Sequence, residues 1–557
     1  MKMRVAYIPR PHENKTYRYP FIVQSYRNEE GKPRTRTIMN LTALPEHVVR
    51  AIDVALRNGD TGADAVSAAD VHFDGALDFG HVWSVWRLME QLGIVDLLDL
   101  LPRQHRHSIA AMIADRVANP LPFSKRALRD DFEGGPLARI LGNPATGALN
   151  DWYEALESLL ANQPAIEKAL FPGVGERVFL YDITSSYFEG TRCPLAAFGY
   201  NRDGKKGKMQ IVIGLLCDAR GRPVAAQVFE GNTADQSVAL SQVRALREKF
   251  GVREIVFVGD RGMITSKRIE ELGGKNYEWA RYITAIKRSD MMEMVEDETH
   301  PIQIELFDER NLVEVREGNA RHILCHNPLR RERDAAVRLR LIEKTEEKLE
   351  SIKANMRAGR LKKKEKIEKR LWRWINRWGM ERFFTVEAGE GQFSWRRNQE
   401  QIERYSRLDG CCVITSNIAP DAMQTAEVVA RYKSLQQVEK AFRSMQTADL
   451  FVRPIRHWNA DRVKGHVFMC MLAYLVTWEA RRRLFEFLKR DPDTRQCDGN
   501  SLREIWKTLA GVKIGVLKIG EQTITQLNPL TSFQKQLLKA LGAPLNKKEM
   551  ERLSLRI

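Results

Sequence analysis

Residues 177–187 read Arg-Val-Phe-Leu-Tyr-Asp-Ile-Thr-Ser-Ser-Tyr, and this run sets the architecture predicted for the chain. It is a nearly continuous apolar stretch interrupted by Asp182, which is typical of a central strand buried on both faces. A bare carboxylate there is costly, so it must be paired, hydrogen-bonded or bound to a metal ion. The alternative role for Asp182 is to accept hydrogen bonds from backbone amides near the strand end.

The segments that follow this strand predict a mixed sheet with helices packed on it. A hairpin signal, Ala219-Arg-Gly-Arg222, separates the next two strands. After the first strand, the pattern predicts elements in the order β-β-α-β-α-β: Met209–Asp218, Pro223–Glu230, Gln236–Phe250, Glu254–Gly259, a helix from Ser266, and Arg281–Ile286.

A second acidic residue, Asp260, follows the apolar run Ile255-Val-Phe-Val258 and therefore lies at the C-terminal end of a predicted strand. Open α/β sheets build their sites at those ends. Helix capping is the alternative, but Thr265 and Ser266 lie nearer to the next helix and suit that role better.

The third acidic residue, Glu439, lies within a helix predicted over Ala426–Gln446. The residues on one face of that helix are spaced 4-3-4-3-4: Val428, Tyr432, Leu435, Glu439, Phe442 and Gln446. Glu439 thus interrupts a mostly apolar stripe. The alternative is a glutamate at the edge of the stripe, paired with Lys440 or Arg443.

Composition indicates a soluble intracellular protein that meets a polyanion. The 557 residues include 89 Lys+Arg and 72 Asp+Glu, so the net charge is 89 − 72 = +17. A hydrophobic content of 43% excludes a mostly disordered chain, and seven cysteines in this length exclude a disulfide scaffold. The start of the chain lacks the apolar run of a secretory signal. The most apolar stretch, Val467–Trp478, is too short to span a bilayer.

Much of the positive charge lies in residues 330–382, which hold 19 Lys+Arg and 9 Asp+Glu, or 19 − 9 = +10. Two series in this tract are spaced 3-4-3-4, on either side of Ala358-Gly-Arg360, and predict a helical hairpin with an apolar seam. They are Ile342, Thr345, Leu349, Ile352 and Met356, and then Lys364, Ile367, Leu371, Trp374 and Trp378. We expect Lys362, Lys363 and Lys364 to contact nucleic acid; the alternative is a solvated or dimerising arm.

Together, these residues resemble the DDE transposases of bacterial insertion sequences. The likeness is to the long-insertion branch of the IS-four superfamily, which also contains the Tn-five-like enzymes. The motifs that carry it are Tyr181-Asp-Ile-Thr-Ser-Ser-Tyr187, Glu230-Gly-Asn-Thr-Ala-Asp235, Val258-Gly-Asp-Arg-Gly-Met263, Tyr432 through Glu439 to Arg443, Arg453-Pro-Ile-Arg-His457 and Gly465-His466.

The resemblance implies an RNase-H-like core in which Asp182, Asp260 and Glu439 bind two divalent metal ions, Mg²⁺ or Mn²⁺ as a substitute. The superfamily's late helix carries Y-x2-R-x3-E-x6-K. This chain keeps Tyr432 and Glu439 but has Leu435 and Gln446 at the Arg and Lys positions.

The two departures leave DNA contacts to other residues of the late region. We expect Tyr432, Lys440, Arg443, Arg453 and His457 to take part in them; for His457 the alternative is a satisfied core histidine.

The predicted function is divalent-metal-dependent cleavage and strand transfer of DNA. The implied partners are double-stranded DNA, as terminal inverted repeats and target, and a second copy of the chain, in a nucleoid-associated cytoplasmic setting with no membrane. The alternatives are a related RNase-H-fold nuclease or decayed transposase, and a non-catalytic basic DNA-binding protein. Zinc is disfavoured because His322, Cys325 and His326 have no second ligand pair at finger spacing.

Changes in period along the chain divide it into six predicted regions. They are a small basic β-rich region at 1–70, a helical region expected to bind DNA at 71–175, the first part of an α/β catalytic core at 176–289, an insertion with the basic hairpin at 290–410, the second part of the core at 411–480, and a helical C-terminal region at 481–557.

Overall fold

A computed structural model describes most of the chain, and its internal contacts divide it into two compact units. The helical unit comprises Met1–Gly173, Ile183–Thr233 and Val438–Ile557, and the sheet unit comprises Val174–Asp182 and Ala234–Gln437. The described residues are 3–12, 15–28, 32–58, 71–171, 173, 177–200, 207–234, 241, 244, 247–262, 264, 269, 271–272, 277–361, 363–389, 392–445, 455, 457–488, 500–519 and 522–553.

An eight-stranded mixed sheet contains the strands predicted for the catalytic core, in the order β10-β11-β14-β9-β8-β5-β6-β7. Strand β5 (Val178–Tyr187) pairs in parallel with β8 (Ile255–Gly259), which pairs in parallel with β9 (Ala280–Ala285). Strands β6 (Gln210–Asp218) and β7 (Pro223–Glu230) form the predicted hairpin. The predicted RNase-H-like mixed α/β class, with β5 as a central strand, is therefore confirmed.

The insertion extends this sheet. Strand β14 (Cys411–Ser416) pairs with β9, β11 (Ala320–His326) with β14, and β10 (Val313–Glu317) with β11, all antiparallel. Helix α11 (Arg288–Glu296) precedes them. Between α11 and β10, Ile304–Leu306 forms the 3-10 turn η4, in which the Leu306 amide donates to the Gln303 carbonyl.

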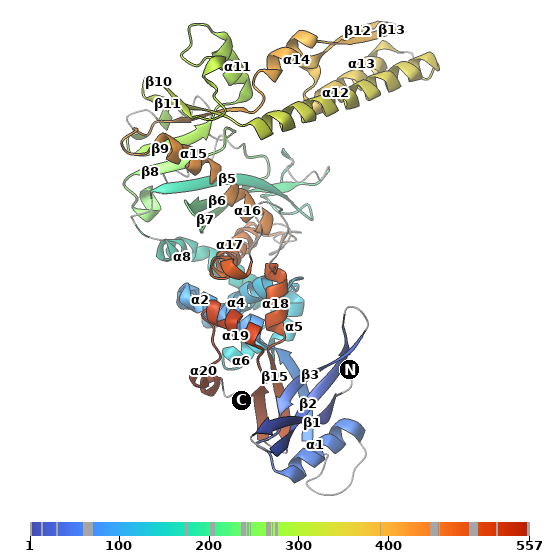
Figure 1. The fold of residues 1–557 in the computed structure, drawn as a ribbon, viewed down its shortest axis with the longest axis vertical. Coiled ribbons are helices and arrows are strands. Elements are labelled where there is room, and N and C mark those ends of the chain that lie inside the picture. The colour runs from blue at the N-terminus through green and yellow to red at the C-terminus, as the bar shows by residue number, and fades with distance from the viewer. Residues whose placement is uncertain are drawn as a thin grey trace. The chain divides into compact units, whose positions relative to one another are not determined.

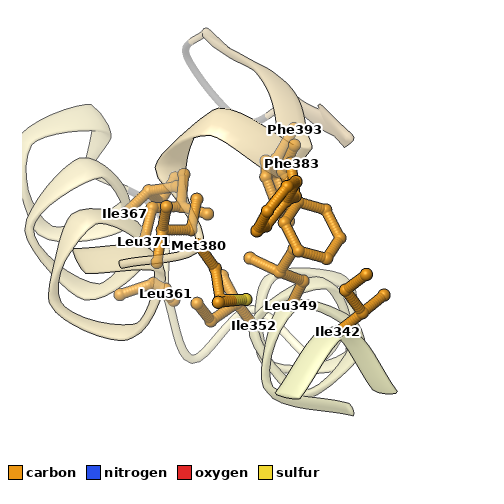
Figure 2. Close-up of a cluster of buried hydrophobic side chains, with 11 residues drawn as sticks. Ile342, Leu349, Ile352, Leu361, Ile367, Leu371, Met380, Phe383 and Phe393 are labelled. Atoms are coloured by element: carbon orange, nitrogen blue, oxygen red, sulfur yellow. The ribbon is translucent and has the colours of Figure 1, made fainter. Parts of the chain in front are cut away.

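The predicted helical hairpin is present as α12 (Pro328–Arg357) and α13 (Lys364–Ile375). Its seam is buried, and Figure 2 shows seam residues of both helices facing one cluster. Phe383, Phe384 and Phe393 fill the same cluster. They belong to the turn η6 (Glu381–Phe383) and to a β-hairpin, β12 (Phe384–Gly389) with β13 (Gln392–Arg397). Lys364, placed in the seam from spacing, is instead exposed.

In the helical unit, helix α17 (Ala460–Arg483), labelled in Figure 1, has buried residues along most of its length. It contacts α4 (Arg103–Ala118), α7 (Leu149–Ala161) and β7. A Cβ at Gly465 would lie 2.1 Å from the Leu156 carbonyl oxygen, so only glycine permits this approach of α17 to α7. The other helices before the core are α2 (Gly80–Gln91), α3 (Ile94–Leu97), α5 (Lys125–Phe132), α6 (Pro136–Ile140) and α8 (Gln163–Leu170).

The N-terminal region is β-rich, with three antiparallel strands, β1 (Met3–His12), β2 (Lys15–Arg27) and β3 (Pro33–Asn40), beside helix α1 (Glu46–Asn58). The C-terminal region has the expected helices α18 (Leu502–Ala510), α19 (Ser532–Ala540) and α20 (Lys547–Arg552). It also has an unpredicted hairpin, β15 (Lys513–Ile519) with β16 (Gln522–Leu527), which pairs with β4 (Val71–Asp78). This pairing partner lies more than 400 residues away, so local periodicity did not reveal it.

The helices predicted at Gln236–Phe250 and from Ser266 fall largely outside the described residues. Among the helices that the structure does describe, none combines the length and the apolar character needed to cross a bilayer.

Candidate active site

The two aspartates predicted from the strands lie at the same level of neighbouring strands. In the parallel pairing of β5 with β8, Tyr181 is opposite Gly259. Asp182 directly follows Tyr181, and Asp260 directly follows Gly259. Adjacent strands are about 4.8 Å apart, so the register brings the two carboxylates into one neighbourhood. Asp182 is half-buried within β5, whereas Asp260 is exposed just beyond β8. The predicted position of Asp260 at a strand end is confirmed.

A pocket of about 380 Å³ in the sheet unit opens onto Asp260. Its walls come from the ends of β8 and β9, from α11, α12 and β14, and from helix α15 (Thr425–Lys433). The polar side chains that line it include Asp260, Arg261, Arg288, Arg330, Asp334 and Tyr432. The pocket therefore combines carboxylates with arginines from both the core and the insertion.

Tyr432, the first residue of the late-helix motif, is half-buried in α15 and lines this pocket. Burial, followed by the negative charge of Asp260, raises the pKa of its phenol well above the ordinary value. The hydroxyl therefore stays protonated at neutral pH and is a hydrogen-bond donor or acceptor beside Asp260.

The single helix predicted over Ala426–Gln446 is wrong, because the structure has two helices, α15 and α16 (Gln436–Arg443). Near Ser434, the amides of Leu435 and Gln437 donate to carbonyls three residues back, and the Ser434 hydroxyl donates to the Arg431 carbonyl. Glu439 is exposed on α16, beside the buried Val438. The stripe that placed it on one face with Tyr432 is therefore not a single helical face.

The donor set can be tested against a divalent ion. Carboxylate oxygens are hard ligands that suit Mg²⁺ or Mn²⁺. Asp260 makes no ion pair with any residue that the structure describes. Over those same ranges, no group of three or more His, Cys, Asp or Glu side chains lies at metal-binding spacing. Asp182 and Asp260 fit the ion as two ligands of the sheet unit, and the role of Glu439 stays a prediction.

The predicted DNA contacts fall on surfaces or outside the described residues. Lys440 and Arg443 are exposed on α16, and Lys363 and Lys364 are exposed at the start of α13. Arg453 and Lys362 lie outside the described residues, as does Gln446.

His457 lies in the helical unit, with its ring 5.9 Å from that of Tyr153 and 5.5 Å from that of His466. Burial, and then the charges of Lys125 and Arg462, lower its pKa to about 3. His457 is therefore uncharged at neutral pH, so any contact with a DNA phosphate would be a hydrogen bond and not an ion pair.

Comparison of the chain with protein-family models identifies two matching families. The family described as "Transposase DDE domain" matches residues 174–476, more than half of the chain. The chain belongs to the DDE transposase family. Residues 6–65 match the family described as "IS1634 family transposase, N-terminal domain". The protein is thus a DDE transposase, an enzyme that cleaves DNA and transfers its strands. A search among curated proteins found no match.

Three arginines of the transposase's pocket were not singled out from the sequence. Arg261 directly follows Asp260, so the sequence places it next to that carboxylate but does not indicate what it does. Arg288 is the first residue of α11, and Arg330 lies in α12 of the insertion; both line the pocket. In a chain with 89 Lys+Arg, no local signal separates these two from solvated cations.

Proposed function

We propose that Asp182, Asp260 and Glu439 are the catalytic residues of this transposase and hold divalent ions, with Mg²⁺ as the natural metal and Mn²⁺ as a substitute. The observation that carries the proposal is the register of β5 and β8, which sets Asp182, within β5, at the level of Asp260, just beyond β8. DDE transposases generally use a divalent metal. When bound, such ions supply activation of the attacking oxygen and charge stabilisation of the leaving oxygen.

The side chains of this transposase then have defined roles. Asp182 and Asp260 supply oxygen ligands, and Tyr432 offers a neutral hydroxyl beside Asp260. No side-chain nucleophile is needed, because water attacks in the first cut and a freed DNA 3′-hydroxyl attacks in strand transfer. One set of residues therefore serves both steps.

The proposed substrates are the terminal inverted repeats of an insertion sequence and a target duplex. The charge of +17 and the exposed Lys363 and Lys364 support a long DNA contact. Two element ends must be held together, which favours a homodimer on DNA, acting on nucleoid DNA in a bacterial cytoplasm. We also propose membership of the long-insertion branch of the IS-four superfamily, because β10, β11, α12 and α13 all lie between Asp260 and Glu439.

The test is cleavage of terminal-repeat DNA in Mg²⁺ by the wild type and by Asp182→Asn, Asp260→Asn and Glu439→Gln. Each variant is expected to lose about 10³-fold in rate, since each removes a ligand of the ions that stabilise the transition state. Asp421→Asn is the matched control: it removes an exposed carboxylate of the sheet unit and should cleave like the wild type.

The outcomes separate the competing functions. Cleavage without strand transfer would identify a nuclease or a decayed transposase. Binding of terminal-repeat DNA without cleavage in any divalent metal would identify a non-catalytic binding protein. Unchanged cleavage by any one of the three variants would remove that residue from the catalytic set.

A further inference from the structure

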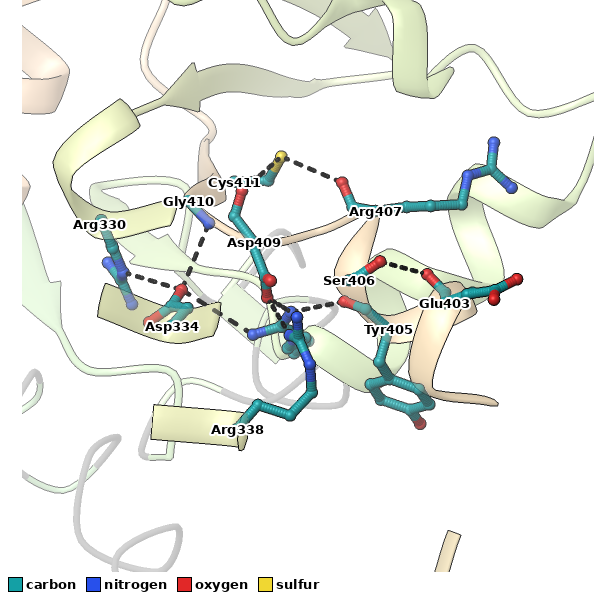
Figure 3. A network of polar contacts seen from close by, with 11 residues as sticks. Arg330, Asp334, Arg338, Glu403, Tyr405, Ser406, Arg407, Asp409, Gly410 and Cys411 are labelled. Carbon is teal, nitrogen blue, oxygen red and sulfur yellow. Dashed lines mark hydrogen bonds and ion pairs between the residues drawn. The ribbon is translucent and has the colours of Figure 1, made fainter. Parts of the chain in front are cut away.

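The pocket beside Asp260 holds an arrangement of charges that the proposed catalytic set leaves unexplained. Figure 3 shows a polar network that includes three residues of the pocket lining, Arg330, Asp334 and Cys411. The Asp409 carboxylate accepts hydrogen bonds from Arg288 and from Arg338, both at 2.6 Å. Asp409 is buried, so this carboxylate is satisfied by two arginines that are held in place.

Asp334 is held more loosely than Asp409. It accepts a hydrogen bond of 3.3 Å from the Gly410 amide. Its Oδ2 lies 3.8 Å from Arg330 Nε and 3.9 Å from Arg288 Nη1, longer than the 2.7–2.9 Å of a charge-assisted hydrogen bond. The Arg330 side chain is 55% exposed. Its guanidinium is therefore available to a better acceptor than Asp334.

Two further donors remain in the pocket. Arg288 Nε is buried and has no hydrogen-bond partner among the residues that the structure describes. Arg261 is exposed beside Asp260 and forms no ion pair within those same residues. The pocket lining then contains three arginines (261, 288 and 330) against two carboxylates (260 and 334), a surplus of 3 − 2 = +1.

This surplus fits a phosphodiester. Arginine presents a planar fork that matches phosphate oxygens, and a phosphate is a stronger acceptor than the distant Asp334. Arg330 lies in the first turn of α12, a 30-residue helix whose positive end is at the pocket. The first turn of α12 thus lies at the pocket rather than on the outer face of the hairpin.

We propose that this pocket binds one phosphate of the DNA strand next to the phosphate cut at Asp260, with Arg330 as its positioning residue. The inference rests on the proposed function, since it takes Asp260 as the catalytic neighbour. The insertion then has a second role, because it supplies a wall of the catalytic pocket as well as carrying the basic hairpin.

The test combines Arg330→Gln with single neutral methylphosphonates placed at each position around the cut. Arg330→Gln is expected to slow single-turnover cleavage about 10- to 100-fold, the range for a lost hydrogen bond to a charged group. Arg330→Lys should recover part of that loss. Arg333→Gln, which removes an exposed arginine of α12 that does not line the pocket, should stay within twofold of the wild type.

The methylphosphonate scan gives a readout that a purely structural arginine would not move. One position near the cut should slow the wild type by a similar factor, and the same substitution should have no added effect in Arg330→Gln. If Arg330→Gln behaves like Arg333→Gln, or if every position stays equally sensitive in Arg330→Gln, the proposal is wrong.

A binding version separates this inference from the catalytic proposal. The scan is repeated as equilibrium DNA binding in Ca²⁺ with Asp182→Asn, and with Arg330→Gln added to it. A position-specific loss of affinity that depends on Arg330 would support the pocket even if the wild type did not cleave. If the wild type cleaves normally but no such loss of affinity is found, the phosphate-binding proposal is wrong and the catalytic proposal stands.

Discussion

Two regions of this transposase treat their ionisable side chains in opposite ways. Around Asp260, in the sheet unit, arginines and carboxylates line a pocket, and Arg288 forms an ion pair with Asp409. Around α17, in the helical unit, burial lowers the pKa of His457 to about 3 and that of Lys125 to about 7. His81 in α2 follows the same trend, with a pKa of about 4.

The difference indicates whether the basic side chains of each region are available to a ligand or serve in packing. A charge kept beside an open pocket is available to a ligand, whereas a group that burial neutralises contributes to packing. From the sequence, His457 was expected to contact DNA, whereas Arg330 was not singled out. Their surroundings separate them, because Arg330 lies at the pocket while His457 packs against Tyr153 and His466.

The strongest test of a packing role in the helical unit is Phe468→Ala. Phe468 is 1% exposed in α17, so its truncation is expected to lower the free energy of unfolding by about 3–5 kcal/mol. Denaturant unfolding measures the loss. Phe485→Ala is the control, because Phe485 is 67% exposed. A loss below about 1 kcal/mol for Phe468→Ala would contradict a tightly packed α17.

The buried histidine predicts a pH dependence of stability. His457 stays neutral in the folded state down to about pH 3, whereas in the unfolded chain it takes up a proton below about 6.5. Stability is therefore lost as the pH falls below about 6.5. Between pH 7 and 5 the wild type should lose about 2 kcal/mol more than His457→Gln.

The control for this pH series is His47→Gln, at an exposed position in α1. Between pH 7 and 5 this variant should lose as much free energy of unfolding as the wild type, because both retain His457. Equal pH dependence in the wild type and in His457→Gln would mean that His457 ionises in the folded state, and the contrast with the pocket would fail.

The smallest expected effect concerns the exposed basic hairpin. Replacing Lys363 and Lys364 with Gln should weaken DNA binding several-fold and reduce the slope of log K against log salt by about 1.8. Fluorescence anisotropy over a salt series measures both quantities. Lys547→Gln with Lys548→Gln, on exposed α20, is the matched control. An unchanged slope would leave the hairpin a structural or dimerising arm.

The sequence predicted the features that depend on local pattern. Apolar runs located β5 and β8 and so placed Asp182 and Asp260, and the 3-4 spacing located the seam from Ile342 to Leu371. These signals work because burial imposes a period on neighbouring residues.

Features that depend on distant pairing or on backbone detail were not predicted. The spacing from Val428 to Glu439 continues across Ser434, although the backbone hydrogen bonds change there from four residues back to three. Strand β15 takes β4 as its partner, and Arg330 reaches the pocket only because the insertion extends the sheet. Side-chain periodicity records none of these contacts.

The central claim, that Asp182 and Asp260 hold the catalytic metal, is tested most directly by a change of metal preference. Asp182→Cys and Asp260→Cys each replace a hard oxygen ligand with a thiolate, which binds Mg²⁺ poorly and Mn²⁺ better. Both variants should be inactive on terminal-repeat DNA in Mg²⁺ and recover at least about tenfold in Mn²⁺, while Asp421→Cys cleaves equally well in both. Full activity of either variant in Mg²⁺, or no recovery in Mn²⁺ by a folded variant that still binds DNA, would contradict the claim.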